Sequence, residues 1–250
     1  MRIVVGHLYP GYLNIYADRG NIAVLDRRAA LRGHELDLRS LGIGNPVDPD
    51  AYDLLYVGGG QDREQALVTP DLVEKSEAIQ SAHSSGVALL AVCGGYQLLG
   101  RGYRGRGGSF MPGVGLFPHE TVAGTTRMIG DVLLECELEP GDKHQLAGFE
   151  NHAGRTLLDS GAAALGRVMF GFGNDGESGF EGCRSGRAIG TYLHGPLLPR
   201  NPWLADWLLA QAIAHASGGE PRPLEPLSDE LEEEAFRVSA ERARKRGGRR

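Results

Sequence analysis

Residues 87–100 read VALLAVCGGYQLLG. The apolar run at residues 87–92 predicts a buried strand, two glycines follow Cys93, and residues 96–99 begin a helical pattern. This order is typical of a nucleophile elbow, where a reactive side chain lies in a strained turn and small neighbours leave room for the backbone. The turn also places the Cys93 sulfur at the start of a helix, where free N–H groups favour a thiolate. We therefore interpret Cys93 as a nucleophile, although an isolated cysteine is more often a small buried side chain.

Strand and helix patterns alternate on the N-terminal side of this stretch. Apolar runs predict strands at residues 2–6, 35–38 and 54–57, and helical spacing of apolar residues predicts helices at residues 21–32 and 71–84. Alternation of this kind indicates βαβ units and a mostly parallel sheet.

The pattern changes to strands and turns after residue 110. Strands are predicted at residues 128–138, 148–151 and 164–170, and residues 184–187 form a turn before a strand that ends at His194. Antiparallel strands often extend a parallel sheet. The predicted fold class is therefore α/β, with three layers and a mostly parallel sheet that has antiparallel additions.

The chain is expected to divide after residue 218. Residues 202–216 predict a helix, because Pro202 opens it, Leu and Ala fill it, and Gly218 and Gly219 follow it. Residues 219–250 are Pro-rich at first, then acidic, then basic, and charge blocks of this kind are usually disordered. We expect one domain at residues 1–218 and a charged tail at residues 219–250, partly disordered with a partly helical middle, in preference to a helix that docks a partner.

Composition argues against several classes of protein. The 26 Lys and Arg residues against 32 Asp and Glu give a formal charge of −6, so the chain lacks the basic surface of a nucleic-acid protein. Its longest apolar run is too short to cross a bilayer, and the N-terminus shows no cleavable signal pattern, so we expect a cytoplasmic protein. The three cysteines form no C-x-x-C pair, so neither a disulfide framework nor a metal site is expected.

Histidine is the first candidate for the proton transfers that a thiolate needs when it attacks an amide. His194 follows an apolar strand and precedes Gly195, which places it at the edge where open α/β sheets build their sites. The sequence pattern alone does not exclude His7, His119 or His152 from this role. The other histidines have the surroundings of surface or satisfied side chains: His34, His83, His144 and His215.

A second glycine cluster, at residues 58–60, directly follows the predicted strand at residues 54–57. Its backbone N–H groups could cradle a phosphate or complete an oxyanion hole. The sequence has neither G-x-x-x-x-G-K-[ST] nor a G-x-G-x-x-G that opens a helix, so an oxyanion role beside the predicted cysteine elbow fits better.

Five stretches of the chain resemble the class I, cobyric-acid-synthase-like glutamine amidotransferases, and within that group the glutaminase subunits of lipid II isoglutaminyl synthase. They are LYPGYLNIYADRGN at 8–21, GGGQD at 58–62, CGGYQLLG at 93–100, GFENHAGRT at 148–156 and GTYLHGPLLPRNP at 190–202. Together they cover most of residues 1–216 in family order. The resemblance implies the flavodoxin-like fold of class I glutamine amidotransferases.

The resemblance also implies a chemistry for the site. Cys93 would attack the side-chain amide of glutamine to give a γ-glutamyl thioester, and His194 would protonate the departing ammonia and then activate water. The backbone N–H groups of Gly60 and Gly94 would hold the oxyanion.

Two further side chains are implied to meet the substrate. Gln97 would lie beside glutamine, and Arg127 matches a family position that contacts it. A guanidinium suits a bidentate clamp on the α-carboxylate, although an exposed arginine at a strand end is an equally good reading. Many class I members carry a Glu two residues after the histidine, where this chain has Pro196, and either Asp18 or Glu150 could orient the imidazole instead.

The resemblance finally implies a partner. The ammonia would pass to a Mur-ligase-like synthetase subunit, MurT, in a heterodimer, and MurT would use ATP and Mg to amidate the D-glutamate α-carboxyl of lipid II in peptidoglycan synthesis. This subunit would need no cofactor and would reach lipid II through its partner at the membrane surface. Two alternatives stay open: the glutaminase component of a cobyrinate or cobyric acid amidating enzyme, and a non-catalytic scaffold subunit.

Overall fold

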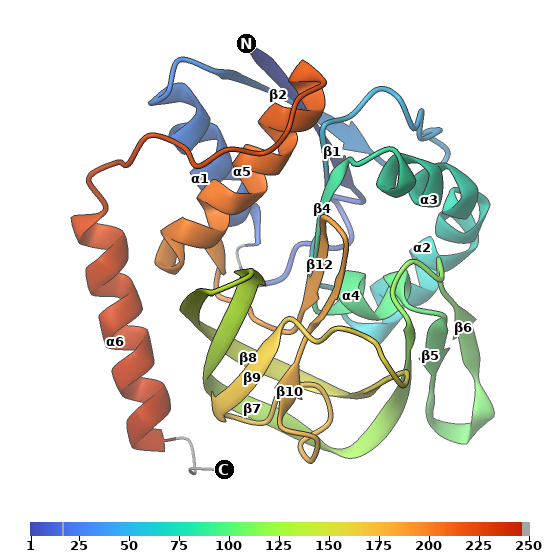
Figure 1. Ribbon diagram of the computed structural model, residues 1–250. Coiled ribbons are helices and arrows are strands. Elements are labelled where there is room, and N and C mark those ends of the chain that lie inside the picture. The colour runs from blue at the N-terminus through green and yellow to red at the C-terminus, as the bar shows by residue number, and fades with distance from the viewer. Residues whose placement is uncertain (17, 247–250) are drawn as a thin grey trace.

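A six-stranded sheet forms the centre of the molecule in the computed structural model, which describes residues 1–16 and 18–246 (Figure 1). Its strand order is β11-β12-β4-β3-β1-β2, and all neighbours are parallel except β11 and β12. The strands are β1 (Arg2–Leu8), β2 (Glu35–Leu41), β3 (Leu54–Val57), β4 (Ala88–Val92), β11 (Cys183–Ser185) and β12 (Ala188–Thr191). The mostly parallel sheet expected from the alternating pattern is confirmed.

Apolar residues bury the middle of this sheet completely. Every residue of β3 and β4 is buried, as expected for strands covered on both faces.

The predicted end of the last strand at His194 is wrong, because β12 stops at Thr191. His194 instead forms an isolated antiparallel bridge with Phe149 of the second sheet.

Helices cover both faces of the parallel sheet (Figure 1). They are α1 (Arg19–Ala30) and α5 (Pro202–Ser217) on one face, with α2 (Asp62–Glu74), α3 (Ser76–Ser84) and the short α4 (Gly94–Leu99) on the other. The single helix expected at residues 71–84 is wrong, because those residues form the end of α2 and all of α3, with Lys75 between them. No helix in the described ranges is long and apolar enough to cross a membrane.

Most of the antiparallel strands form a second sheet, while only β11 extends the first. The strand order of this second sheet is β10-β9-β7-β5-β6, with β8 paired to β7. The strands are β5 (Gly102–Arg104), β6 (Phe110–Pro112), β7 (His119–Glu139), β8 (Asp142–Leu158), β9 (Gly166–Phe170) and β10 (Phe180–Glu181), with a 3-10 turn η1 (Arg106–Gly108). An irregularity between Ala123 and Met128 interrupts the long β7–β8 hairpin, and such breaks bend a strand pair.

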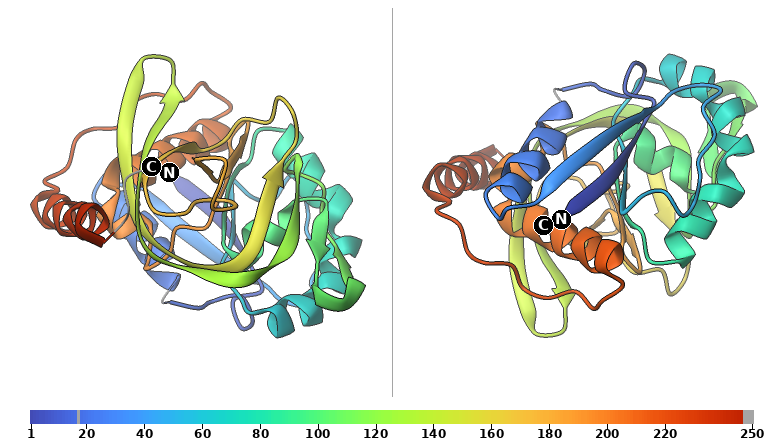
Figure 2. Two further views of the ribbon diagram at one scale, coloured as in Figure 1. Left: turned by 90° about the horizontal axis from the view of Figure 1, so that it is seen from below. Right: turned by 90° about the horizontal axis from the view of Figure 1, so that it is seen from above.

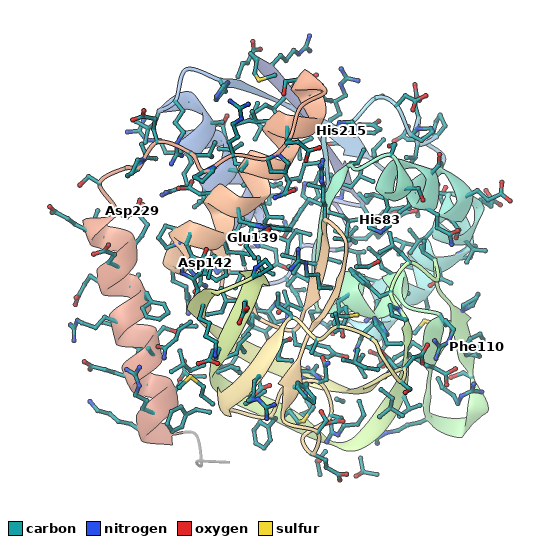
Figure 3. All side chains as sticks on the ribbon, viewed as in Figure 1. His83, Phe110, Glu139, Asp142, His215 and Asp229 are labelled. Carbon is teal, nitrogen blue, oxygen red and sulfur yellow. The ribbon has the colours of Figure 1, made fainter. Side chains whose placement is uncertain are left out.

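The turn of this hairpin packs beside α5. Glu139 and Asp142 lie at the turn (Figure 3), and Trp207 Nε1 of α5 donates a hydrogen bond to Glu139 Oε1 at 3.0 Å. The ring of Trp203, also on α5, stacks on His144 with centroids 4.2 Å apart. Helix α5, which covers one face of the parallel sheet, therefore also packs on the second sheet and joins the two.

The charged C-terminal segment contains a well-packed helix, α6 (Glu230–Arg246). It lies at the edge of the molecule next to the β7–β8 hairpin in every view (Figure 2). Phe236, Ala240 and Ala243 pack against Leu133 and Ala147. The sequence suggested a tail with a partly helical middle, whereas residues 230–246 form one continuous helix because its small and aromatic side chains cover the hairpin. The division at residue 218 stays a prediction.

Candidate active site

Cys93 lies in the tight turn between β4 and α4 that the sequence predicted. Its backbone has φ 50° and ψ −105°, a strained conformation for a residue with a side chain. The next two residues must be small, since a Cβ on Gly95 would lie 2.7 Å from Val57 Cγ1 and 2.8 Å from Val57 O. The Cys93 N–H donates to Thr191 O of β12 at 2.7 Å, which fixes the turn against the neighbouring strand.

The two predicted glycine segments meet beside this turn. A Cβ on Gly94 would lie 2.8 Å from both the N and the O of Gly60, so the two backbones are in close contact. Gly94 is the first residue of α4, where the N–H has no partner within the helix. Backbone N–H groups gathered beside a thiol are what stabilisation of an oxyanion requires.

His194 is completely buried and faces both Cys93 and Asp18. Its Nδ1 lies 3.6 Å from Asp18 Oδ1, and Asp18 Oδ2 accepts the Gly59 N–H at 2.7 Å. Burial acts to lower the pKa of His194, but the charges and hydrogen bonding of Cys93 and Asp18 outweigh it and raise that pKa to about 10. The arrangement therefore favours a charged imidazole beside Cys93, where it can supply a proton during nucleophilic catalysis.

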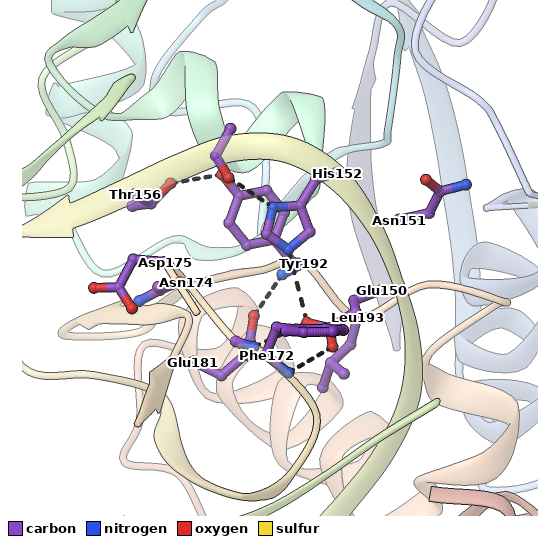
Figure 4. Close-up of polar contacts among 12 residues, drawn as sticks. Glu150, Asn151, His152, Thr156, Phe172, Asn174, Asp175, Glu181, Tyr192 and Leu193 are labelled. Atoms are coloured by element: carbon purple, nitrogen blue, oxygen red, sulfur yellow. Dashed lines mark hydrogen bonds and ion pairs between the residues drawn. The ribbon is translucent and has the colours of Figure 1, made fainter. Parts of the chain in front are cut away.

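The structure distinguishes the two carboxylates that the sequence left open as partners of His194. Asp18 faces His194, whereas Glu150 Oε2 lies 3.7 Å from His152 Nε2. Glu150 also accepts the N–H groups of Phe172 and Gly173, at 2.7 Å and 2.9 Å (Figure 4). Glu150 therefore holds a loop and a different histidine. Sequence spacing could not rank the two, because Asp18 precedes α1 whereas Glu150 lies on β8 of the second sheet.

Gln97 is held in a chain of hydrogen bonds that runs from Gln65 through Tyr192 to Thr156. Its Oε1 accepts from Gln65 Nε2 at 2.9 Å, and its Nε2 donates to Tyr192 Oη at 3.1 Å. Tyr192 continues to Thr156 Oγ1 at 2.6 Å and stacks on the His152 ring at 3.5 Å between centroids (Figure 4). Neither residue was among the predicted site residues: Gln65 lies outside every motif, and Tyr192 lies within the family stretch at 190–202 but was assigned no role.

A cavity of about 770 Å³ opens beside Cys93. Gly60, Gln97 and Arg127 also line it, so four of the six predicted site residues border the cavity, whereas Gly94 and His194 are not among its lining residues. Its other lining residues are Ile15, Tyr16, Gln61, Asp62, Arg63, Gln65, Asn151, His152, Ala153 and Gly154. The cavity therefore carries both positive and negative side chains, as the binding of a free amino acid requires.

Arg127 is an exposed side chain that is nonetheless held in place. Its Nε donates to Asn151 Oδ1 at 2.9 Å, and its Nη2 donates to Asn151 O at 3.0 Å. Asn151 Nδ2 in turn donates to Tyr16 Oη. The guanidinium is thus directed along the cavity wall, and the reading of Arg127 as a free strand-end side chain loses support.

His7, His119, Cys136 and Cys183 lie outside this arrangement, whereas His152 lines the cavity. Burial lowers the pKa of His7 to about 4 and that of His119 to about 3, so both are neutral in the folded chain. Burial likewise raises the pKa values of Cys136 and Cys183 to about 12. Within residues 1–16 and 18–246, no group of three or more His, Cys, Asp or Glu side chains is arranged to hold a metal.

The profile of the CobB/CobQ-like glutamine amidotransferase domain matches residues 4–202. The chain is 36% identical over 241 residues to the lipid II isoglutaminyl synthase (glutamine-hydrolyzing) subunit GatD of Staphylococcus aureus, covering 96% of each chain. It is also 36% identical to the Streptococcus pneumoniae protein of the same name, covering 92% of this chain and 89% of the relative.

More distant similarities agree with the fold. A cobyric acid synthase of Caulobacter is 33% identical, but the match covers 84% of this chain and only 42% of that protein. The structure of PurLQS from Thermotoga maritima superposes with a TM-score of 0.54 at 16% identity, covering 85% of this chain and 96% of that one. A crystal structure of a glutamine amidotransferase gives a TM-score of 0.55 at 17% identity, covering 83% and 98%. The expected class I amidotransferase fold is confirmed.

Proposed function

The chain belongs to the CobB/CobQ-like glutamine amidotransferase family, and we propose that it is the glutamine-hydrolysing subunit of a lipid II isoglutaminyl synthase. The observation that carries this proposal is the match to the two GatD subunits, which spans 96% of the chain in one case and 92% in the other. The burial of a Cys–His–Asp arrangement beside a cavity supports the hydrolytic part.

In the proposed reaction the Cys93 thiolate attacks the Cδ carbonyl carbon of glutamine. The resulting oxyanion is held by the backbone N–H groups of Gly60 and Gly94. His194, charged in the pair, gives its proton to the amide nitrogen, which leaves as ammonia while the γ-glutamyl thioester forms. The now neutral His194 takes a proton from water, whose oxygen attacks the thioester and releases glutamate with the Cys93 thiolate restored.

Asp18 orients the imidazole throughout this cycle. Its Oδ1 faces His194 Nδ1, and this leaves Nε2 for the moving proton. Its second oxygen holds the Gly59 N–H, next to the proposed oxyanion residue Gly60. One buried carboxylate therefore fixes both the proton-transfer group and the oxyanion loop.

The substrate-binding role falls to Arg127 and Gln97. The Arg127 guanidinium clamps the α-carboxylate of glutamine, with Asn151 keeping it in place. Gln97 lies beside the side-chain amide, and its bonds to Gln65 and Tyr192 fix its orientation. Asp62, on the same cavity wall, supplies a negative charge for the α-ammonium group.

The partner in this proposal is a Mur-ligase-like synthetase subunit, MurT, in a heterodimer. MurT would activate the D-glutamate α-carboxyl of lipid II with ATP and Mg, and the ammonia would amidate it to D-isoglutamine. This chain carries no nucleotide-binding loop motif, so the subunit itself would work without a cofactor. The complex would act in the cytoplasm, at the membrane surface where lipid II is exposed.

Two alternatives are less well supported. The match to the Caulobacter cobyric acid synthase covers 42% of that protein at 33% identity, whereas the matches to the two GatD subunits cover 96% and 89% of theirs at 36% identity. This favours the lipid II assignment over a cobyrinate or cobyric acid amidating enzyme. A scaffold subunit would have no need of a charged histidine buried against Cys93 and Asp18.

The test is the Cys93→Ala variant in complex with the partner subunit. It should abolish glutamine hydrolysis and glutamine-dependent amidation, while amidation from added ammonium continues. Cys136→Ala, which alters a buried cysteine away from the site, is the matched control. Glutamine hydrolysis by Cys93→Ala would refute the assignment, and failure of 6-diazo-5-oxo-norleucine to label Cys93 in the wild-type complex would favour the scaffold.

A further inference from the structure

The C-terminal helix α6 is connected to the turn that follows His194. The link is Arg200, the last residue of the 3-10 turn η2 (Leu198–Arg200). Arg200 Nη2 donates to the carbonyl oxygen of Gly195, and Arg200 Nη1 donates to Ser239 Oγ of α6 at 3.2 Å. Ser239 is only 4% exposed, so this contact lies inside the packed interface between α6 and the body.

The surroundings of Arg200 are unusual for an arginine. It is half-buried, and its hydrogen bonds go to a neutral carbonyl and a neutral hydroxyl. In the described part of the chain it has no acidic partner within 4 Å, and burial lowers its pKa. Asp131 favours the charged form of Arg200 only from a distance, so the partly buried guanidinium depends on its two neutral hydrogen-bond partners. What it fixes is the peptide directly after His194.

Gly195 makes this contact possible. Its φ of +95° is reached easily only by glycine, and a Cβ there would lie 3.3 Å from Arg200 Nη2. The backbone of His194 is fixed by its bridge to Phe149, with the His194 N–H donating to Phe149 O at 2.8 Å. The Gly195 carbonyl is the next point along the chain at which the turn can be held.

The opposite side of the same turn rests on the start of α1. A Cβ on Gly20 would lie 2.5 Å from Pro196 Cγ, so Pro196 packs closely on Gly20. Leu198 N–H donates to Asn21 Oδ1 at 2.8 Å. Gly20 and Asn21 lie two and three residues after Asp18, which faces His194. The turn is therefore held between α1, which carries Asp18, and Arg200, which is tied to α6.

We propose that Arg200 is a positioning residue for His194, and that α6 completes the active site by holding Arg200 through Ser239. Without this support the turn at Gly195 and Pro196 relaxes, and the imidazole moves relative to Asp18 and Cys93. The C-terminal helix is then a working part of the glutaminase, although it lies outside the matched family domain, which ends at residue 202. The inference rests on the proposed glutaminase function.

The test compares Arg200→Gln with Arg200→Lys in the full-length chain bound to its partner. Arg200→Gln should lower kcat for glutamine hydrolysis by about 10-fold or more, because displacement of a catalytic group by about 1 Å can cost 10²-fold. KM for glutamine should stay within about twofold, since the cavity wall with Arg127 is untouched. Arg200→Lys keeps a charged donor and should recover most of the loss. Amidation from added ammonium should not change.

The pH profile separates positioning from a general loss of structure. The groups that face His194 are Cys93 and Asp18, with the Tyr16 ring 5.1 Å away. If the imidazole moves away from the two charges, its pKa falls, so the alkaline limb of kcat/KM should move to lower pH in Arg200→Gln. Arg237→Gln, which breaks exposed ion pairs with Glu234 and Glu241 on the same helix, is the matched control and should leave the profile unchanged.

Ser239→Ala keeps the test decisive if Arg200→Gln does not fold. It should lower kcat by about fivefold and shift the alkaline limb in the same direction, because it removes one hydrogen bond from the link. An unchanged kcat and pH profile in Ser239→Ala and in a folded Arg200→Gln would overturn the inference. So would an equal loss of ammonium-dependent amidation, which would indicate a structural role. Failure of the proposed function would appear differently, as absence of glutamine hydrolysis in the wild-type complex.

Discussion

Replacing Asp18 with Asn tests the central electrostatic argument of the site. Asn has nearly the same shape, and its carbonyl oxygen can still accept the Gly59 N–H, now 2.7 Å from Asp18 Oδ2. What the variant loses is the negative charge 3.6 Å from His194 Nδ1. The substitution therefore separates the charge of Asp18 from its packing.

The size of the effect follows from the pKa of His194. That pKa is raised from 6.5 to about 10, a difference of 3.5, which corresponds to about 5 kcal/mol of interaction with the charged imidazole. Cys93 and Asp18 share this interaction, and we assign roughly a third to two-thirds of it, about 1.5 to 3 kcal/mol, to the Asp18 charge, which acts across 3.6 Å. Asp18→Asn should therefore lower kcat/KM by about 10- to 160-fold.

The assay is the pH dependence of glutamate release by the complex with its partner. Because the folded His194 pKa is raised, its imidazole stays charged up to about pH 10 and loses that charge above it. In Asp18→Asn the alkaline limb should move down by about one to two pH units. Asp26→Asn, an exposed change on the same helix, is the matched control. Activity within about threefold of wild type with an unmoved alkaline limb would refute the reasoning, and the predicted loss in Glu150→Gln instead would assign the role to Glu150.

Three further predictions address the oxyanion loop, the substrate clamp and the fold. Gly94→Ala places a Cβ 2.8 Å from Gly60 N and O, so kcat should fall by about 10²-fold or more, and an unchanged kcat in a folded variant would contradict the oxyanion role. Arg127→Lys removes the fork geometry of an exposed clamp, so KM for glutamine should rise by about 5- to 30-fold with kcat retained, and an unchanged KM would argue against the clamp. Burial raises the pKa of Glu181 from 4.5 to about 8, although Tyr192 N–H and Thr191 Oγ1 act to lower it. Its contribution to stability should be fully present below pH 4.5 and lost as the pH rises to about 8, a change of about 5 kcal/mol in the free energy of unfolding. Urea unfolding at several pH values should show a smaller dependence in Glu181→Gln, and an equal slope in both proteins would contradict the prediction.

Local signals were sufficient for the elements that build the elbow. The apolar run before Cys93 and the two glycines after it specify a buried strand and a tight turn within a few residues, and both occur in the structure. The residues of β3 were predicted with their correct bounds for the same reason. The family resemblance implied that Gly60 and Gly94 act together, and in the structure they meet because β3 and β4 are parallel neighbours whose carboxyl ends share one edge of the sheet.

Local sequence patterns did not predict the contacts between segments that are far apart in the chain. The β7–β8 hairpin pairs with β5 and β9 and so forms a second sheet. Only β11 adds an antiparallel strand to the parallel sheet. The charge blocks at the C-terminus suggested a solvated tail, yet Phe236 and Ala240 pack on the hairpin and Ser239 reaches Arg200.

Local sequence patterns predicted the α/β class and the cysteine elbow, and the family resemblance implied the pairing of Cys93 with His194. Only the tertiary structure decided that Asp18, and not Glu150, faces the imidazole, and that Gln65, Asn151 and Arg200 support the site. The physical reason is that a carboxylate or a guanidinium acts over only a few ångströms. Which groups come that close depends on how α1, the second sheet and α6 pack together.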